Sequence, residues 1–185
     1  MIFSLFKRRG DPTADSLYAS IVAQARQPAF YLDFAVADTV DGRFDMIVLH
    51  LALVIERLKD GDATARECAR NVSETFFSDM DRSLREMGVG DLSVPKKVRK
   101  MADAFYGRVK AYEAGLATDG DEDLVAALKR NIWPDAENAS APAKGLAGYV
   151  RAAAAVLADM PSETVIAGEV VWPNPAAFFK QDASS

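Results

Sequence analysis

The sequence contains few of the residue types that carry out chemistry. Among its 185 residues there is one cysteine, Cys68, and one histidine, His50. A single cysteine cannot form an internal disulfide and is typical of a reducing compartment. The spacings HExxH, CxxC, GxSxG and the P-loop are also absent from the sequence, so the usual signatures of metal and phosphate chemistry are missing. We therefore predict no enzyme, no metal site and no cofactor.

The few reactive side chains fit structural roles. His50 lies in a run of leucine and valine residues, which favours a hydrogen-bonded histidine of the core over a ligand or a general base. Cys68 has no second cysteine and falls within a predicted helix, as packing residues do. Asp79 and Asp81 resemble a metal-binding pair, but side chains two residues apart on a helix point in different directions.

Apolar runs long enough to cross a bilayer are also lacking. The most apolar stretch, residues 46–55, is far shorter than the roughly 20 residues that a membrane-spanning helix needs. The first residues, MIFSLFKRRG, place their cations after the apolar side chains, which is the reverse of a secretory signal. Two interpretations of residues 1–12 stay open: a weak, reversible contact with a membrane interface, or a frayed terminus.

Apolar residues recur at helical spacing along most of the chain. They repeat at threes and fours over residues 63–87 and 94–116, which predicts two long amphipathic helices. Residues 44–62 are apolar nearly all round, as expected for the central helix of a core. Further helices are predicted at residues 13–26, with Thr13 as cap, and at residues 29–34, 121–132 and 146–160. We predict an all-α, single-domain helical bundle of about six to seven helices with a less regular C-terminal tail.

The chain divides into three predicted parts. Residues 1–12 form the N-terminal segment, and residues 13–132 form the helical core. Residues 133–185 comprise a linker, an alanine-rich helix and a tail packed on the core. The tail at residues 163–180 is either a short helix or an extended segment laid on the body, and the sequence leaves both open.

The two long helices are joined by a turn whose sequence is specific. Gly88 follows the first helix where a left-handed residue is needed, and Val89 is expected to fold back onto Leu84. Ser93 is the predicted cap of the next helix, and Pro95 is tolerated in its first turn. We therefore predict an antiparallel pair of helices with a short connection.

Charge is distributed unevenly around this turn. The net charge is −5, but residues 94–116 hold six Lys and Arg against two Asp and Glu, giving +4. An acidic protein with one basic helix is not a general nucleic-acid binder. The six-residue connection and the acidic first helix fit a helix-turn-helix poorly, so no DNA binding is expected. The basic helix is either a surface for RNA, anionic lipid or an acidic partner, or a solvated face.

Two long strings of sequence resemble a known family. QPAFYLDFAVADTVDGRFDMIVLHLALVIERLK and FSDMDRSLREMGVGDLSVPKKVRKMADAFYGR, which lie within residues 27–108, are similar to the ubiquinol–cytochrome c chaperone family, the assembly factors of the respiratory cytochrome bc1 complex. The resemblance implies an all-helical, non-catalytic assembly chaperone that binds newly synthesised cytochrome b. The absence of a transit peptide favours a bacterial form in the cytoplasm, with a peripheral position on the inner face of the cytoplasmic membrane left open.

Partner-binding residues are predicted where the two strings match the family pattern and where the basic helix begins. They are Arg43, Asp81, Arg82, Arg85, Glu86, Gly88, Gly90, Asp91, Lys96, Lys97, Lys100, Tyr106 and Arg108. We hypothesise a client groove beside the helical hairpin, with the cations at its rim. The predicted partner is cytochrome b, while the ribosome or a membrane surface stay open as further partners. The alternative function is a helical module that binds nucleic acid or a membrane surface through the basic helix.

Overall fold

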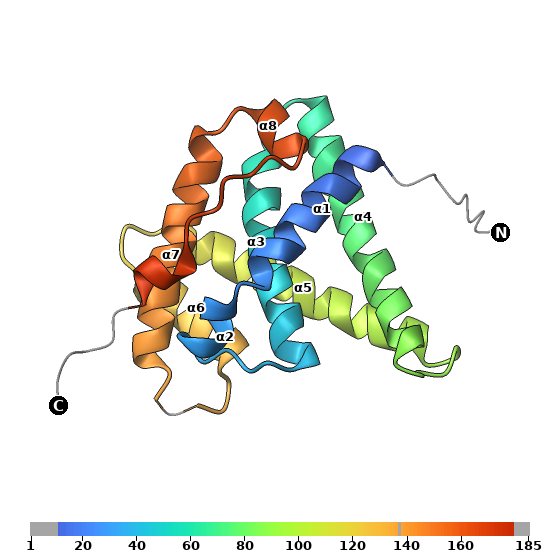
Figure 1. Ribbon diagram of the computed structural model, residues 1–185, viewed down its shortest axis with the longest axis horizontal. Coiled ribbons are helices and arrows are strands. Elements are labelled where there is room, and N and C mark those ends of the chain that lie inside the picture. The colour runs from blue at the N-terminus through green and yellow to red at the C-terminus, as the bar shows by residue number, and fades with distance from the viewer. Residues whose placement is uncertain (1–10, 137, 180–185) are drawn as a thin grey trace.

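The computed structural model describes residues 11–136 and 138–179, and this part of the chain forms helices and no strand. Figure 1 shows their arrangement as a bundle. The elements are α1 (Pro12–Ala25), α2 (Pro28–Leu32), α3 (Val40–Leu58), α4 (Ala63–Glu86), α5 (Val94–Leu116), α6 (Glu122–Ile132), α7 (Ser140–Asp159), α8 (Ser162–Ile166) and the 3-10 helix η1 (Pro175–Phe178). The predicted all-α single domain is confirmed.

The starts of α1, α3 and α7 differ from the prediction, and in α1 and α3 the capping residue explains the difference. Asp11, rather than Thr13, caps α1, since its side chain accepts a hydrogen bond from the Thr13 backbone N–H at 3.1 Å. Helix α3 begins at Val40 because Thr39 caps it by accepting from the Gly42 N–H at 3.2 Å. Ser93 occupies the cap position of α5, but its side chain makes no capping hydrogen bond. Helix α7 begins at Ser140, which is six residues earlier than predicted.

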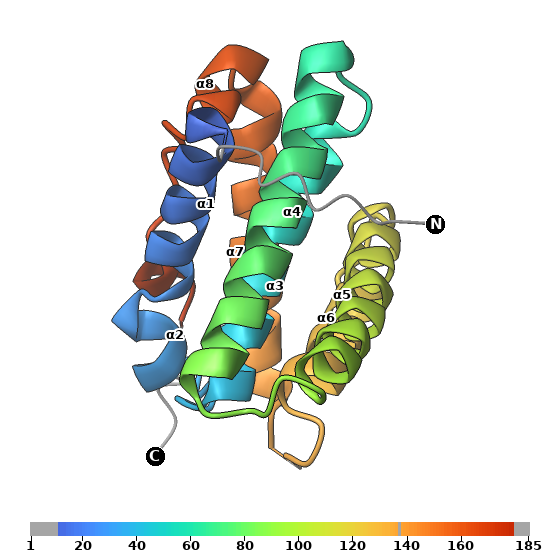
Figure 2. The same cartoon turned by 90° about the vertical axis from the view of Figure 1, so that its right-hand side faces the viewer.

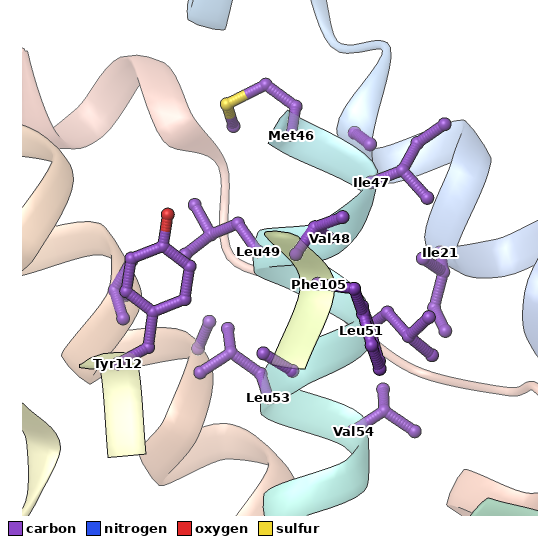
Figure 3. Packing of buried hydrophobic residues seen from close by; sticks show 14 of the residues in the cluster. Ile21, Met46, Ile47, Val48, Leu49, Leu51, Leu53, Val54, Phe105 and Tyr112 are labelled. Atoms are coloured by element: carbon purple, nitrogen blue, oxygen red, sulfur yellow. The ribbon is translucent and has the colours of Figure 1, made fainter. Parts of the chain in front are cut away.

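Helix α3 lies at the centre of the core. Its residues 45–54 are all buried, and α1, α4, α5 and α7 pack around it. Figure 3 shows residues of α3 packed with Ile21 of α1 and with Phe105 and Tyr112 of α5. Each fully buried apolar side chain of this size contributes about 1.5–3 kcal/mol to stability. The prediction of a central helix that is apolar on all sides is confirmed.

A buried hydrogen-bond network around His50 ties four parts of the chain together. His50 Nδ1 donates to the Met46 carbonyl at 2.7 Å, because a carbonyl can only accept, and His50 Nε2 accepts from the Tyr149 hydroxyl at 2.7 Å. Gln24 Nε2 donates to the same hydroxyl at 2.9 Å and to the Pro173 carbonyl at 3.1 Å. The network therefore joins α1, α3, α7 and the C-terminal segment, and the predicted core histidine is confirmed.

The C-terminal segment contains both of the structures that the sequence left open. It forms the short helix α8 and then an extended stretch that ends in η1, which Figure 1 shows running back from α8 alongside α7. Trp172 Nε1 donates to Ser20 Oγ at 3.2 Å, and Ser16 Oγ donates to the Ala167 carbonyl at 3.1 Å. These bonds attach the segment to the outer side of α1.

The turn between α4 and α5 has the predicted geometry. Gly88 has a φ of 80°, its N–H donates to the Arg85 carbonyl at 2.9 Å, and the Val89 N–H donates to the Leu84 carbonyl at 3.0 Å. This bond pair defines a Schellman motif. Figure 1 shows that α5 then runs back at an oblique angle to α4, toward α6. The hairpin therefore opens into a V rather than packing along its whole length.

Candidate partner-binding surfaces

The two strings that carry the family resemblance meet at a buried ion pair. Arg108 Nη2 of α5 lies 2.8 Å from Asp45 Oδ1 of α3, with 19% and 10% of the two side chains exposed. The guanidinium also stacks over the Phe44 ring, 5.7 Å from its centre. Arg108 therefore holds α5 against α3, and its observed partner lies inside the protein.

This ion pair is poorly satisfied. The Asp45–Arg108 contact has the distance of an ion pair but not the geometry of a hydrogen bond, so Asp45 Oδ1 has no hydrogen-bond partner among the described residues. Arg108 Nε, Tyr112 Oη and Asn131 Nδ2 also have none within this part of the chain. Burial raises the pKa of Asp45 to about 6, although Arg108 opposes that rise. The buried polar groups between α3, α5 and α6 are thus less completely hydrogen-bonded than those around His50.

A groove of about 1200 Å³ runs between α1 and α4. Figure 2 shows these two helices side by side on the viewer's face of the molecule. The groove is lined by Asp11, Asp15, Tyr18, Ala19, Val22, Ala23 and Arg26 from the α1 side, and by Glu67, Asn71, Glu74, Thr75, Ser78, Asp79 and Arg82 from α4. We hypothesised a groove beside the α4–α5 hairpin, but of its expected rim only Arg82 lines this one.

The groove is acidic and its floor is bridged by hydrogen bonds. Five carboxylates line it against two guanidinium groups. Tyr18 Oη donates to Asp79 Oδ2 at 2.9 Å, and Asn71 Nδ2 donates to Asp11 Oδ2 at 3.0 Å. Burial, together with the Asp79 carboxylate, raises the pKa of Tyr18, so its phenol stays protonated as the donor. The groove therefore has fixed walls and a negative charge.

A smaller side pocket of about 380 Å³ adjoins the groove, because Arg26 lines both. Its other lining residues are Pro28, Tyr31, Leu32, Asp38 and Arg43. Arg43 pairs with Asp38 at 2.7 Å, and both side chains are more than half exposed. Leu32 is 80% exposed. The side pocket thus places Arg43, a predicted partner-binding residue, next to an exposed apolar side chain.

Most of the other predicted residues gather at the end of the α4–α5 hairpin. Arg85 pairs with Asp81 and with Asp91, each at 2.6 Å, and these contacts hold the pKa of Asp81 below its usual value. Arg82 pairs with Asp79 and, at 4.0 Å, with Glu86. Lys96, Lys97 and Lys100 make no ion pair in the described part of the chain. The other predicted residues, Gly88, Gly90 and Tyr106, have uncharged side chains. Tyr106 lies further along α5 and is 63% exposed.

The residues of the α1 wall of the groove are not among the predicted partner-binding residues. Tyr18 and Arg26 fell within the predicted helix 13–26 and Asp11 within the N-terminal segment, and the family resemblance covers only residues 27–108. The spacing of Asp11, Asp15 and Glu67, Glu74 on two helices gives a charge pattern, but only the fold shows that the two patterns face one groove.

These observations define an all-α protein with open, charged surfaces. Within the described residues, no three His, Cys, Asp or Glu side chains gather to hold a metal ion, and no helix is long and apolar enough to cross a membrane. The family model of the ubiquinol-cytochrome C chaperone matches residues 32–172. The chain belongs to this family, which confirms the resemblance found in the sequence.

Named relatives and a solved structure agree with the family. The chain is 27% identical over 173 residues to the mouse ubiquinol-cytochrome c reductase complex assembly factor 1, covering 90% of this chain and 58% of the mouse protein. The Xenopus laevis assembly factor 1 is 25% identical over 157 residues, which are 84% of this chain and 78% of that protein. The crystal structure of the Cbp3 homolog from Brucella abortus has a TM-score of 0.81 and 39% identity, covering 95% of this chain and 98% of that one.

Proposed function

We propose that this chain is a non-catalytic assembly chaperone that binds newly synthesised cytochrome b and supports assembly of the cytochrome bc1 complex. The observation that carries the proposal is the family match over residues 32–172. The relatives are named as assembly factors of ubiquinol-cytochrome c reductase. The 39% identity to the Brucella abortus protein supports the bacterial form, and the single cysteine supports a reducing cytoplasm.

The α1–α4 groove is the proposed client seat. Its walls are joined by the Tyr18–Asp79 and Asn71–Asp11 hydrogen bonds, so little conformational freedom is lost when a client binds. Ala19, Val22 and Ala23 supply small apolar side chains between the charged groups. A surface of about 800 Å² per partner is enough for a specific complex. The groove and the side pocket together offer a shaped surface whose cations are Arg26, Arg82 and Arg43.

The charge of the groove indicates which part of the client it takes. Five carboxylates against two guanidinium groups attract a segment that carries cations beside apolar side chains, and they repel an acidic one. Such charges set the orientation and rate of encounter more than the affinity. The occupant that fits is a cationic, amphipathic segment of cytochrome b before it reaches its final place.

The candidate nucleophile and base of the chain are held in unreactive states. Burial raises the pKa of Cys68 to about 11 and lowers the pKa of His50 to about 4. Cys68 is therefore a neutral thiol at neutral pH, and His50 is a neutral imidazole bonded on both nitrogens. These states support a binding role for the chain.

Deletion of the gene tests the proposed function. The expected result is a loss of assembled cytochrome bc1 complex, seen by haem spectra and native gels, which the plasmid-borne chain restores. Normal accumulation of the complex in the deletion strain would overturn the proposal. Restoration of the complex without any cytochrome b captured on the tagged chain would overturn the choice of client.

Charge reversal in the groove tests the client seat. The double variant Glu67→Lys, Glu74→Lys changes two exposed acids of the α4 wall. We expect it to lose capture of cytochrome b by tenfold or more at low salt, with a smaller difference at high salt because the charges are screened. The control Asp119→Lys, Asp159→Lys makes the same change of charge at exposed positions outside the groove. Equal losses in both variants would remove the groove from the mechanism.

A further inference from the structure

The end of the α4–α5 hairpin combines exposed apolar side chains with cations. We call residues 87–100 the tip. Leu92 is 99% exposed and Met87 is 52% exposed. Lys96, Lys97 and Lys100 are exposed and make no ion pair within the described residues. The tip therefore places two exposed apolar side chains beside three ammonium groups that have no acidic partner in the described part of the chain.

The acids near the tip do not neutralise these lysines. Residues 85–100 contain five cations and two acids, a difference of +3. Of the two acids, Asp91 is held by Arg85 at 2.6 Å, and Glu86 lies 4.0 Å from Arg82. Arg85 and Arg82 therefore engage the two carboxylates, and the charge of Arg99 and of the three lysines is left for an external anion.

We propose that the tip docks on a membrane surface that carries anionic lipid, with Leu92 entering the interface and the three lysines on the headgroups. The charge is complementary to such a surface, and polybasic segments with apolar neighbours bind it reversibly. Single-stranded RNA is the other polyanion that this charge suits, but it is bound on aromatic side chains. Residues 87–100 contain none, so the tip fits a lipid surface better.

The fold presents the tip in a way that suits a flat surface. Figures 1 and 2 show the α4–α5 connection near the lower edge of the molecule, beyond the ends of both helices, with the connection between α6 and α7 projecting further at the same edge. The Schellman motif at Gly88 fixes the path of this connection. Leu92 thus stands out from the body without any local unfolding, while the groove opens along the side of α4.

This inference goes beyond the proposed function and is independent of the client. Its test uses the purified full chain with two kinds of vesicle. One is phosphatidylcholine alone, and the other is phosphatidylcholine with about 30% phosphatidylglycerol, which supplies the anionic headgroups. We expect binding to the anionic vesicles in low salt, weak binding to the neutral ones, and release by salt because the attraction is screened.

Three variants locate the binding. The triple variant Lys96→Glu, Lys97→Glu, Lys100→Glu is expected to lose tenfold or more in affinity, and Leu92→Ser about tenfold, since one leucine side chain is removed from the interface. The control Lys110→Glu, Lys144→Glu alters exposed cations outside the tip and should keep most of the binding. Residues 1–10 are present in every variant, so the differences report on the tip.

A labelled cysteine tests insertion directly. Cys68 is buried, so Leu92→Cys can be labelled selectively with an environment-sensitive fluorophore, and Ala155→Cys on the exposed side of α7 serves as the control. A blue shift on anionic vesicles is expected at position 92 and not at position 155.

Each remaining outcome decides against the proposal. Binding that is unchanged in the triple variant would assign the membrane contact to another part of the chain. A labelled RNA that binds more tightly than the vesicles, with no effect of Leu92→Ser, would make the tip a nucleic-acid surface. Absence of vesicle binding by the folded wild type would overturn the inference, whereas it would leave capture of cytochrome b unaffected.

Discussion

The groove lies along helix α4 and the tip follows the end of that helix, but the two surfaces present opposite charge. In the groove, five carboxylates outnumber Arg26 and Arg82. At the tip, Asp91 is paired with Arg85 of α4, and Lys96, Lys97 and Lys100 make no ion pair within the described residues. The groove is therefore an acidic seat along α4, and the tip is a basic contact beyond its end. The counts of charged residues already give the two surfaces opposite signs, and the ion pairs of the tip leave its lysines without an acidic partner in the described part of the chain.

This comparison indicates that the two surfaces can be changed separately. The groove depends on α1 and α4, whereas the tip depends on the turn after α4 and on the first turns of α5. Both depend on α3, which holds α1 on one side through the His50 network and α5 on the other through Asp45. Substitutions at Arg108, His50, Tyr18 and Gly88 separate these contributions. Arg108 bears on both surfaces because it contacts α3, on which both depend.

Loss of Arg108 should have the largest effect. Arg108→Leu leaves Asp45 as a buried charge without its counter-ion, and removal of one partner of such a pair destabilises a protein by about 3–5 kcal/mol. Urea denaturation at pH 7.5, followed by circular dichroism, measures this loss. The exposed cation of Arg99→Leu on the same helix is the control, with a change within about 0.5 kcal/mol.

The pH dependence sharpens this result. Asp45 has a pKa of about 6 in the folded protein, so at pH 5 the carboxyl is largely protonated and needs no counter-ion. The difference between wild type and Arg108→Leu should therefore shrink as the pH falls from 7.5 to 5. A difference that is equal at both values would show that Arg108 acts by packing alone.

Protonation of His50 should loosen the other side of α3. Burial lowers its pKa from 6.5 to about 4, so the neutral form stabilises the fold fully above pH 6.5. That contribution, at most about 3 kcal/mol, is lost as the pH falls from 6.5 to 4. Asp45 acts in the opposite direction between pH 6 and 4, so the measurement is the difference between wild type and His50→Gln. A difference that does not vary with pH would contradict the assignment.

The Tyr18 hydroxyl should matter for the groove and not for the tip. Tyr18→Phe removes the 2.9 Å bond to Asp79, and a hydrogen bond to a charged group contributes about 1.5 kcal/mol. We expect thermal unfolding to reveal a loss of this size together with weaker client capture, while vesicle binding is kept. Tyr106→Phe changes a tyrosine that is 63% exposed and should alter stability little. An equal loss of stability in Tyr18→Phe and Tyr106→Phe would show that the Tyr18–Asp79 hydrogen bond does not stabilise the protein.

Substitution of Gly88 should have the smallest effect on stability, and it should affect the tip rather than the groove. Its φ of 80° disfavours any side chain, so Gly88→Ala should cost about 1 kcal/mol. Vesicle binding should weaken because Leu92 changes position, whereas client capture should stay. Gly90→Ala is the matched control, since a Cβ there meets nothing within 4 Å and the φ is not in the left-handed region. If Gly90→Ala proved as harmful, the turn would not be fixed by the Schellman motif.

The helices and the turn could be predicted because their signals are local. Apolar spacing predicts α4 and α5, and Gly88 with Val89 predicts the Schellman motif that the structure contains. The capping residues could be predicted less well, because other polar residues capable of capping lie beside Asp11 and Thr39. The hydrogen bonds in the structure show which residue caps each helix. The start of α7 was missed because its first turns contain Pro142 and Gly145, which resemble a linker.

The candidate site was predicted less well than the fold. Family resemblance brought attention to Arg108, but its interaction with Asp45 joins residues 63 positions apart and no local pattern reveals it. The groove forms because α1 packs beside α4, and the sequence pattern does not indicate which helices pack against each other. Arg82 and Arg43 are the predicted residues that line the two cavities.

Site-specific crosslinking during synthesis of cytochrome b tests the central claim most directly. A photoreactive residue at Ala23, exposed in the groove, is compared with one at Ala155, exposed on α7. If the groove is the client seat, the chain crosslinks to newly made cytochrome b from position 23 and not from position 155. Equal crosslinking from both positions, or none from position 23 while the complex assembles normally, would contradict the account.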